Sequence, residues 1–218
     1  LGNASTGLGG PSSAREITTY DVMRGEAALV DTETETLVPG LTIAPAGMDL
    51  AGAEIELLDV DSRHYRLKEA IHAYAKARPD LTYVLIDCPP SLGLLTVNAM
   101  AAADAVIIPL QCEFFALEGL AQIMRTIGQV RERLNPSLDL QGIILTMYDR
   151  RNNLSREVEA NVREHMGEKV YRTAIPRNVR ISEAPSHGKP ALLYDLKCTG
   201  SQAYVRLATE VIQRERAA

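Results

Sequence analysis

An aspartate at position 87 follows a short apolar run and precedes a sharp change of backbone direction. The run is Tyr83-Val84-Leu85-Ile86, and Cys88-Pro89-Pro90-Ser91 comes directly after Asp87. A continuous apolar run bounded by proline predicts a strand buried on both faces of a parallel sheet. Ligands of such sheets bind beyond the carboxyl ends of the strands, where an aspartate commonly holds Mg²⁺. An aspartate here would equally serve to cap a helix that begins near Ser91, so these residues alone leave both roles open.

Polar or aromatic loops also follow the other predicted strands. Parallel strands place these loops on one edge of the sheet, which is the usual location of a ligand site. Both phenylalanines of the chain, Phe114 and Phe115, lie side by side in one of the loops. Core packing rarely explains two adjacent aromatic residues in a loop, so we expect them to contact a partner or ligand. The loops comprise residues 87–91, 111–119, 148–153 and 175–180.

The elements that must position these loops follow from length and periodicity. The 218 residues, 46% hydrophobic and 23% charged, suit one α/β domain, residues 1–218. Strands are predicted at residues 41–46, 83–87, 105–110, 140–147 and 169–175. Helices are predicted at residues 18–23, 50–58, 66–78, 92–103, 117–134 and 154–166, with a last one that includes residues 204–212. This alternation predicts a mostly parallel sheet with helices on both faces.

Charge and cysteine content narrow the class of protein. Residues 1–148 carry 10 Lys and Arg against 19 Asp and Glu, whereas residues 149–218 carry 13 against 9. A basic C-terminal third would steer a polyanion to one face, although chance clustering on solvated helices gives the same numbers. Three cysteines, Cys88, Cys112 and Cys198, match no zinc spacing and indicate a reducing compartment, the cytoplasm by default. No apolar run approaches the roughly 20 residues that cross a bilayer.

The sixteen residues that begin Ile175-Pro176-Arg177-Asn178 and continue to Pro190 form a highly specific stretch. Together with several shorter stretches along the chain, they resemble the ParA (Soj) family of chromosome- and plasmid-partitioning ATPases, and the resemblance covers essentially all 218 residues. The family belongs to the deviant Walker P-loop class, so the resemblance implies a P-loop NTPase-like fold. It also implies ATP and Mg²⁺ as cofactors, an ATP-bound homodimer, non-specific double-stranded DNA and a ParB-type centromere-binding partner. The other matching stretches are residues 2–9, 50–57, 87–95, 109–113, 116–120 and 145–149.

The resemblance implies a role for each matching residue. Asp87 matches the Walker B aspartate, which is expected to reach Mg²⁺ through water. Residues in two loops match the walls of the adenine site, and two arginines match those that bind DNA without sequence preference. The loop after residue 110 falls near the dimer face of the family. The adenine-site residues are Met147, Asp149, Pro176 and Asn178, the DNA-binding residues are Arg151 and Arg180, and the dimer-face residues are Gln111, Glu113, Phe114 and Phe115.

The chain also departs from the family pattern. Family members begin with a strand, a glycine-rich phosphate loop with two lysines, a helix and a second strand, and no Gly-x-x-x-x-Gly-Lys-Ser/Thr pattern occurs in these 218 residues. We therefore expect this N-terminal βαβ unit, the phosphate-binding lysines and the water-positioning aspartate to be missing, and the Val84–Ile86 edge to be exposed. Two functions follow as hypotheses. One is a ParA-type partition ATPase on nucleoid DNA, with no membrane partner; the alternative is a non-hydrolysing remnant that binds DNA or a partner weakly.

Overall fold

The computed structural model describes residues 3–8 and 17–217, and the chain divides into two compact units. The first unit comprises Leu1–Asp104 and Ile127–Leu138, and the second comprises Ala105–Thr126 and Asp139–Ala218. The single domain expected from the sequence stays a prediction. Of the matching stretch at residues 2–9, Gly2 and Gly9 lie outside the described residues, while Asn3–Gly7 forms helix α1.

The second unit is built on two parallel strands, β3 (Ala105–Gln111) and β4 (Asp139–Thr146). Their register runs from Ala105 opposite Asp139 to Gln111 opposite Thr146, with a shift that leaves Gln141 as the extra residue of β4. Both strands were predicted from their β-branched apolar runs, and both are confirmed. They end at the same edge, so the loops that follow them emerge side by side.

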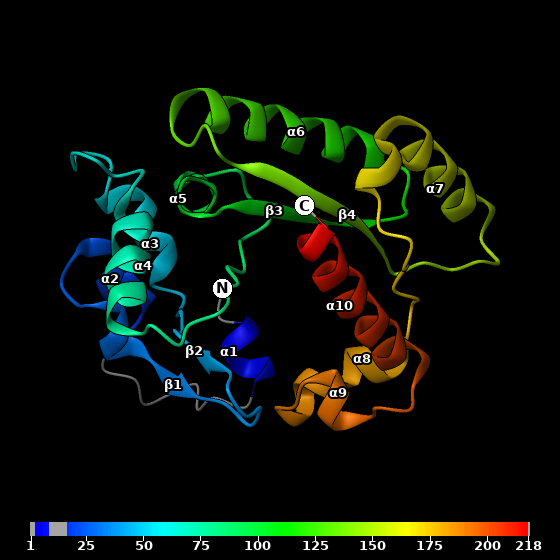
Figure 1. The fold of residues 1–218 in the computed structure, drawn as a ribbon, viewed down its shortest axis with the longest axis horizontal. Helices are drawn as coiled ribbons and strands as arrows, with labels where there is room; N and C mark the ends of the chain where they lie inside the picture. Colours follow the sequence, from blue (N-terminus) through cyan, green and yellow to red (C-terminus); the bar gives the residue numbers. More distant parts are fainter. Residues whose placement is uncertain (1–2, 9–16, 218) are drawn as a thin grey trace. The chain divides into compact units, whose positions relative to one another are not determined.

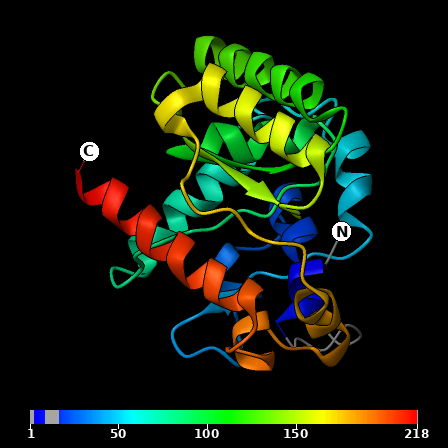
Figure 2. The same cartoon turned by 90° about the vertical axis from the view of Figure 1, so that its right-hand side faces the viewer.

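Helices cover both faces of this strand pair. The first part of α6 (Ala116–Arg133) and α7 (Asn153–Met166) lie on one side of the strands, and α10 (Thr199–Ala217) lies on the other (Figures 1 and 2). The α10 face packs Ala203 and Leu207 with Tyr171 and Ile175, and Ile107 and Ile144 of the strands adjoin this cluster. The shorter helical segments of the unit are η2 (Gly167–Lys169), α8 (Val179–Glu183), η3 (Ala184–His187) and α9 (Ala191–Tyr194).

The strand predicted at residues 169–175 is wrong in part. Backbone N–H groups of Tyr171 and Ile175 do donate to β4, at 2.9 and 2.8 Å. Between them, the N–H groups of Arg172 and Thr173 donate instead to the carboxylate of Glu210 on α10, at 2.8 and 3.0 Å. A regular ladder would direct the N–H of Thr173 at β4, but Glu210 accepts it, and within residues 169–175 the bridge between Ile143 and Val170 stays isolated.

The first unit packs short helices around one apolar cluster. Its elements up to residue 77 are α2 (Thr19–Arg24), η1 (Leu29–Thr32), the antiparallel pair β1 (Thr34–Glu35) and β2 (Thr42–Ile43), α3 (Leu50–Glu56) and α4 (Arg66–Ala77). A capping box starts α2, since Thr18 Oγ1 accepts from Tyr20 N at 3.2 Å and Asp21 accepts from Thr18 N at 2.7 Å. The cluster is formed by Met23, Leu50, Ala53, Leu57 and Leu95.

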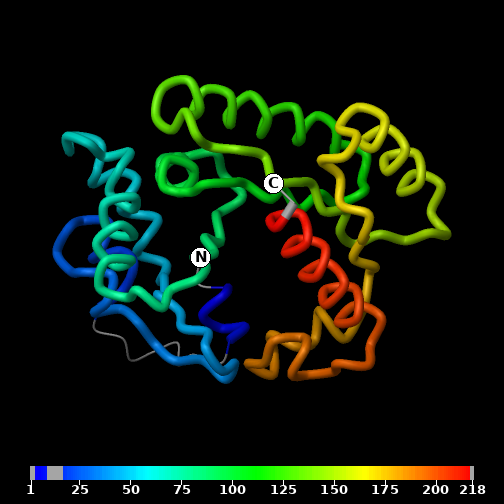
Figure 3. The backbone as a smooth tube through the Cα atoms, in the orientation of Figure 1, coloured from blue at the N-terminus to red at the C-terminus, as the bar shows by residue number. Residues whose placement is uncertain are grey.

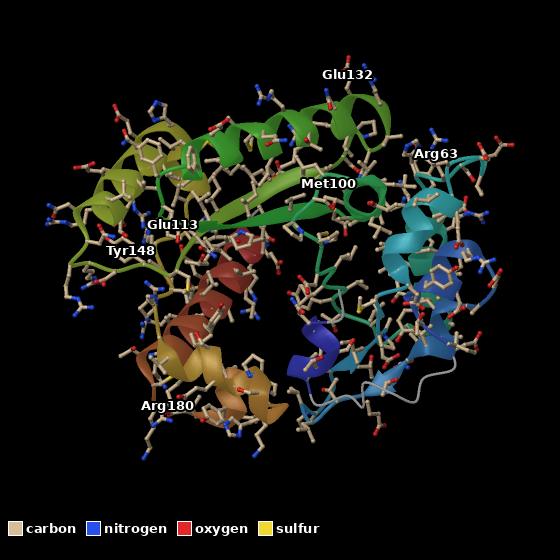
Figure 4. The ribbon with its side chains drawn as sticks, turned by 180° about the vertical axis from the view of Figure 1, so that it is seen from behind. Arg63, Met100, Glu113, Glu132, Tyr148 and Arg180 are labelled. Carbon is tan, nitrogen blue, oxygen red and sulfur yellow. The ribbon has the colours of Figure 1, made fainter. Side chains whose placement is uncertain are left out.

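Helix α5 (Leu94–Ala102) is buried nearly all round, as its Ala- and Leu-rich sequence predicts. Asn98, which is fully buried, donates to the carbonyl oxygens of Arg63 at 2.8 Å and Leu94 at 3.0 Å. Asn135 donates to the carbonyls of Met100 at 3.0 Å and Ala103 at 2.8 Å. Figure 4 labels Arg63 and Met100. The Asn135 side chain, which comes from outside the helix, therefore satisfies carbonyl groups that the C-terminal end of α5 leaves open.

The buried strand predicted at residues 83–87 is absent. The chain between α4 and α5 is an open stretch of backbone without helix or strand from residue 81 to residue 93 (Figure 3). Tyr83, Val84 and Leu85 are 56%, 43% and 85% exposed. A strand exists only where a neighbour completes its ladder, and within the described residues no strand pairs with this segment. The apolar run therefore predicted the wrong local structure, although the expected exposure of Val84 and Leu85 is observed.

Candidate functional site

The loop after β4 is held in an uncommon backbone conformation. Met147, the first residue beyond the strand, has φ of 51°, a left-handed value that costs a non-glycine residue about 1–2 kcal/mol. Hydrogen bonds on Tyr148 keep it there: Tyr148 N donates to Ile175 O at 3.0 Å, and Arg177 N donates to Tyr148 O at 3.2 Å. The parallel bridge between Tyr148 and Pro176 thus joins the two loops that the sequence analysis singled out.

A cavity of about 250 Å³ opens beside this bridge, entirely within the second unit. Three of the four residues predicted to form an adenine site line it, namely Met147, Pro176 and Asn178. The walls are mostly apolar, with a thioether and an amide among them, which suits a flat aromatic ring that also needs hydrogen-bond partners. The remaining lining residues are Pro109, Thr146, Ile175, Ile181 and Tyr204.

Asn178 owes its place in this wall to the start of α8. Its side-chain Oδ1 accepts from Arg180 N at 2.9 Å, which makes it the N-cap, and its Nδ2 donates to Thr199 Oγ1 at 3.0 Å. Gly200 follows Thr199, and a Cβ there would overlap the Ile181 side chain and meet Asn178 Cβ at 3.1 Å. The cavity wall therefore depends on a glycine that lets the first turn of α10 approach α8.

Asp149 does not line the cavity but holds Arg151. Its carboxylate accepts from Arg151 Nε at 3.1 Å and Nη2 at 3.0 Å, and also from Arg151 N at 3.0 Å. The side-chain and backbone hydrogen bonds of Arg151 lower the pKa of Asp149, and the charge of Arg177 contributes in the same direction. The side chain of Arg151 stays 90% exposed, so the carboxylate orients a guanidinium that faces solvent.

Arg180 is also at the surface but is more engaged. Its side chain is 57% exposed and pairs with Glu183 at 3.1 Å and with Asp195 at 3.7 Å. Figure 4 shows it on the outer side of α8. The hydrogen bonds that Arg180 donates to Tyr194 and Glu183 raise the pKa of the guanidinium still further, so it is always charged. A phosphate that approached Arg180 would compete with two carboxylates.

The loop after β3 exposes its aromatic residues. Phe114 and Phe115 are 75% and 71% exposed and meet edge to face, with ring centroids 5.0 Å apart. Gln111 and Glu113 on either side of Cys112 are exposed too, and Figure 4 labels Glu113 at this end of the unit. Cys112 itself is buried, and burial raises the pKa of its thiol to about 11. The loop thus offers aromatic and polar surface, with no reactive thiolate at Cys112.

Asp87 lies in the first unit, in the open segment before α5, and its side chain is exposed. The helix-cap role that the sequence left open is wrong, because α5 has Gly93 as its N-cap and receives its acceptor from another residue, Glu54. In the described part of the chain, no three His, Cys, Asp or Glu side chains gather into a metal cluster. One exposed carboxylate still fits Mg²⁺, which is commonly bound by one or two carboxylates together with substrate phosphates.

Two contributors to the second-unit site were missed by sequence reasoning. Tyr204 was predicted only as part of the last helix, and it is 40% exposed and lines the cavity. Arg177 adds positive charge beside Asp149. Its position between two predicted site residues, Pro176 and Asn178, was the available signal.

Among the helices that the structure describes, none has the length and apolar character that a membrane span requires.

Comparison with known proteins gives consistent matches. The family model AAA_31, described as an AAA domain, matches residues 1–140. The chain is 63% identical over 215 residues to the chromosome partitioning protein ParA of Caulobacter vibrioides, covering 99% of this chain and 80% of that protein. It is 49% identical over 210 residues to the sporulation initiation inhibitor protein Soj of Bacillus subtilis, covering 96% and 82%.

Among solved structures, cobyrinic acid a,c-diamide synthase from Mycobacterium smegmatis superimposes with a TM-score of 0.79 at 36% identity. The match covers 96% of this chain and 76% of that one, whose structure contains bound ADP and magnesium. The predicted fold class, a P-loop NTPase-like α/β fold with parallel strands and helices, is confirmed by this likeness and by the strands described above.

Proposed function

The chain belongs to the ParA/Soj family of chromosome-partitioning ATPases, and from that premise we propose that it acts in segregation as a nucleotide-dependent DNA-binding dimer. The observation that carries the proposal is the bridge between Tyr148 and Pro176. It places a cavity suited to a nucleotide base next to a loop that presents exposed arginine. Nucleotide occupancy and DNA contact would then share one short piece of backbone.

For the nucleotide, we propose that the base of ATP enters the cavity lined by Met147, Pro176 and Asn178. The volume of about 250 Å³ is smaller than a typical pocket for a whole ligand, so it suits one ring system and not the sugar and phosphates. Asp87 would hold Mg²⁺ through water, and the ion would supply charge neutralisation at the phosphates. The chain's own contribution is to orient the base and to present that carboxylate.

For DNA, we propose that Arg151 and Arg180 contact phosphates. Each subunit offers few such contacts, and a dimer doubles them, so binding should depend steeply on nucleotide and on salt. The excess of basic residues after position 148 supports this surface. Asp149 supports it as well, because it holds the exposed guanidinium of Arg151 in one orientation and thereby reduces the entropy lost on binding.

For protein partners, we propose that Gln111, Glu113, Phe114 and Phe115 face the second subunit of the ATP-bound dimer. Two exposed aromatic rings form the kind of apolar centre that dimer interfaces bury. A ParB-type centromere-binding protein would stimulate hydrolysis, and the protein would act on the nucleoid in the cytoplasm. The family resemblance supports these two assignments.

The test is double-stranded DNA binding by the product of the full open reading frame that contains the Leu1 codon, with ATP or ADP. Binding should require ATP and weaken as salt rises. Arg151→Glu should weaken binding to all sequences alike and flatten the salt dependence, by a slope of about 1 for each phosphate that the protein no longer neutralises. The 218 residues alone are assayed beside it for ATP hydrolysis, because the phosphate-loop pattern does not occur in them.

Arg125→Glu is the matched control, since Arg125 is exposed on α6 in the same unit and makes the same change of charge. Equal losses for Arg125→Glu and Arg151→Glu would show only a dependence on net charge and would refute the DNA surface. ATP-independent DNA binding, or hydrolysis by the 218 residues that Asp87→Ala does not reduce, would contradict the nucleotide assignments.

A further inference from the structure

The exposed guanidinium of Arg180 is met by acidic side chains from two segments of the second unit. Its Nη1 donates to Glu183 Oε2 at 3.1 Å, within the short helix α8. Its Nε lies 3.7 Å from Asp195 Oδ2, which belongs to the residue directly after α9. The second distance is that of an ion pair and is too long for a hydrogen bond. Glu183 is therefore the carboxylate that engages Arg180 directly.

Glu183 is held in this position by an aromatic side chain. Tyr194 Oη donates to Glu183 Oε2 at 3.3 Å, and this is the same oxygen that accepts from Arg180. The ring of Tyr194 stacks on His187, with ring centroids 4.8 Å apart and an interplanar angle of 23°. The stack restricts the ring, so the hydroxyl keeps the carboxylate next to the guanidinium.

The two carboxylates differ in what else they bind. Asp195 Oδ1 accepts from the backbone N–H groups of Lys197 at 3.0 Å and Cys198 at 3.1 Å, so Asp195 shapes the turn that leads into α10. Glu183 Oε2 instead meets the side chains of Arg180 and Tyr194. Replacement of Glu183 therefore changes the surroundings of Arg180 and leaves the turn before α10 its hydrogen bonds.

This pairing has a consequence for any phosphate that approaches Arg180. A phosphate oxygen gains a charge-assisted hydrogen bond from the guanidinium, but it must replace a carboxylate oxygen that already accepts one. The side chains of Arg180 and Glu183 are 57% and 42% exposed, and an ion pair with this much solvent around it is weak. Competition from Glu183 should therefore lower the affinity for phosphate without abolishing it.

We propose that Glu183 sets the DNA affinity of the α8 surface by competing with DNA phosphates for Arg180. The inference rests on the proposed function, in which Arg180 contacts phosphates, whereas the pairing of Glu183 with Arg180 stands on the contacts alone. Each subunit then binds DNA more weakly than a free arginine would allow. Two subunits bound together offset this weakness, and the protein leaves DNA when they separate.

The first test measures the pairing without DNA. In the 218-residue chain, phenylglyoxal attacks unprotonated guanidine groups, and Glu183 stabilises the protonated form of Arg180. Glu183→Ala should speed modification of Arg180 by about threefold, as expected for the loss of one exposed ion pair, measured by mass spectrometry of peptides. Arg151, which Asp149 holds, is the internal reference and should react at an unchanged rate.

The second test measures binding of double-stranded DNA by the product of the full open reading frame, with ATP. Glu183→Ala should tighten binding by about threefold for each subunit and thus by about tenfold for a dimer. Glu157→Ala is the matched control, because Glu157 is exposed on α7 in the same unit and its loss changes the net charge equally. Its effect on DNA binding should be much smaller.

A double-mutant cycle shows whether Glu183 acts through Arg180. Combined with Arg180→Ala, the change Glu183→Ala should no longer tighten DNA binding, because the group for which Glu183 competes is absent. A gain that persists in the Arg180→Ala protein, equal gains for Glu183→Ala and Glu157→Ala, or an unchanged phenylglyoxal rate at Arg180 would overturn the inference. Absence of DNA binding by the unmodified protein would refute the proposed function instead, and the phenylglyoxal rates would still decide whether Glu183 holds Arg180.

Discussion

Replacement of Asn135 tests how the buried helix α5 is held at its C-terminal end. Asn135 is 4% exposed, and its Nδ2 donates to Met100 O and Ala103 O, at 3.0 and 2.8 Å. Asn135→Ala removes both donors. Each hydrogen bond contributes a net of about 1 kcal/mol, and the carbonyl of the buried Met100 loses its partner without easy access to water, which adds about 1 kcal/mol. We expect a loss of about 2–3 kcal/mol in the free energy of unfolding.

Urea unfolding followed by far-ultraviolet circular dichroism measures this loss, and a thermal scan should show a fall in Tm of about 4–12 °C, at about 2–4 °C for each kcal/mol in a chain of this size. Asn135→Asp has nearly the same shape and keeps the Oδ1 that accepts from Ser137 Oγ at 2.8 Å. At neutral pH it places a carboxylate against two carbonyls, so it should cost at least as much as Asn135→Ala.

Asn161→Ala is the matched control, because Asn161 is exposed on α7 and a surface change of this kind is expected to stay within about 0.5 kcal/mol. If Asn135→Ala were no more destabilising than Asn161→Ala, the side-chain amide would not be what satisfies the end of α5. The same conclusion would follow if Asn135→Asp were as stable as the unmodified protein, since a carboxylate cannot donate.

Three other measurements follow from single contacts in the second unit. Gly142→Ala should destabilise by about 1–3 kcal/mol in urea, because its Cβ would lie 2.5 Å from the buried ring of Tyr171, and unchanged stability would refute that packing. Burial raises the pKa of Glu210, but the backbone N–H groups that donate to its carboxylate outweigh burial and hold the pKa below the ordinary 4.5. The ionised carboxylate therefore stabilises the folded protein above pH 4.5, and this stabilisation is lost as the pH falls below that value. Glu210→Gln should therefore flatten the acid side of the stability profile, whereas a profile identical to that of the unmodified protein would contradict this. At pH 8 a thiol reagent should leave Cys112 unreacted in the folded protein and label the exposed Cys88, and labelling of Cys112 without urea would show that it is not buried.

Local patterns predicted those elements whose partners are close in sequence or whose periodicity is strong. The helix predicted at residues 66–78 and the strands predicted at residues 105–110 and 140–147 each carry their own signal, and the structure has them as α4, β3 and β4 within a few residues of the prediction. The family also follows from the sequence, because the stretch from Ile175 to Pro190 is long and specific. A resemblance of that length does not depend on how the chain folds locally.

The failures have a common physical cause, which is that a strand and a cap are defined by groups elsewhere in the chain. Residues 83–87 have the composition of a buried strand, but no ladder forms on them within the described residues. Residues 169–175 begin to pair with β4 until the carboxylate of Glu210 captures two backbone donors. The local sequence of neither segment predicts this result, because strand formation depends on groups that lie tens of residues away, such as Glu210 for residues 169–175.

At the candidate site, too, the sequence predicted the residues and the tertiary structure decided their arrangement. Residue types in the loops after the strands were enough to single out Met147, Pro176 and Asn178, and tertiary structure decided that these line one cavity while Asp149 turns to Arg151. The sequence by itself determined the family and the fold class, and it singled out Asp87 as a candidate site residue. Only the folded chain decided that a carboxylate from α3 caps helix α5 beside a glycine at position 93, because hydrogen bonds form between groups that are close in space, whatever their separation in sequence.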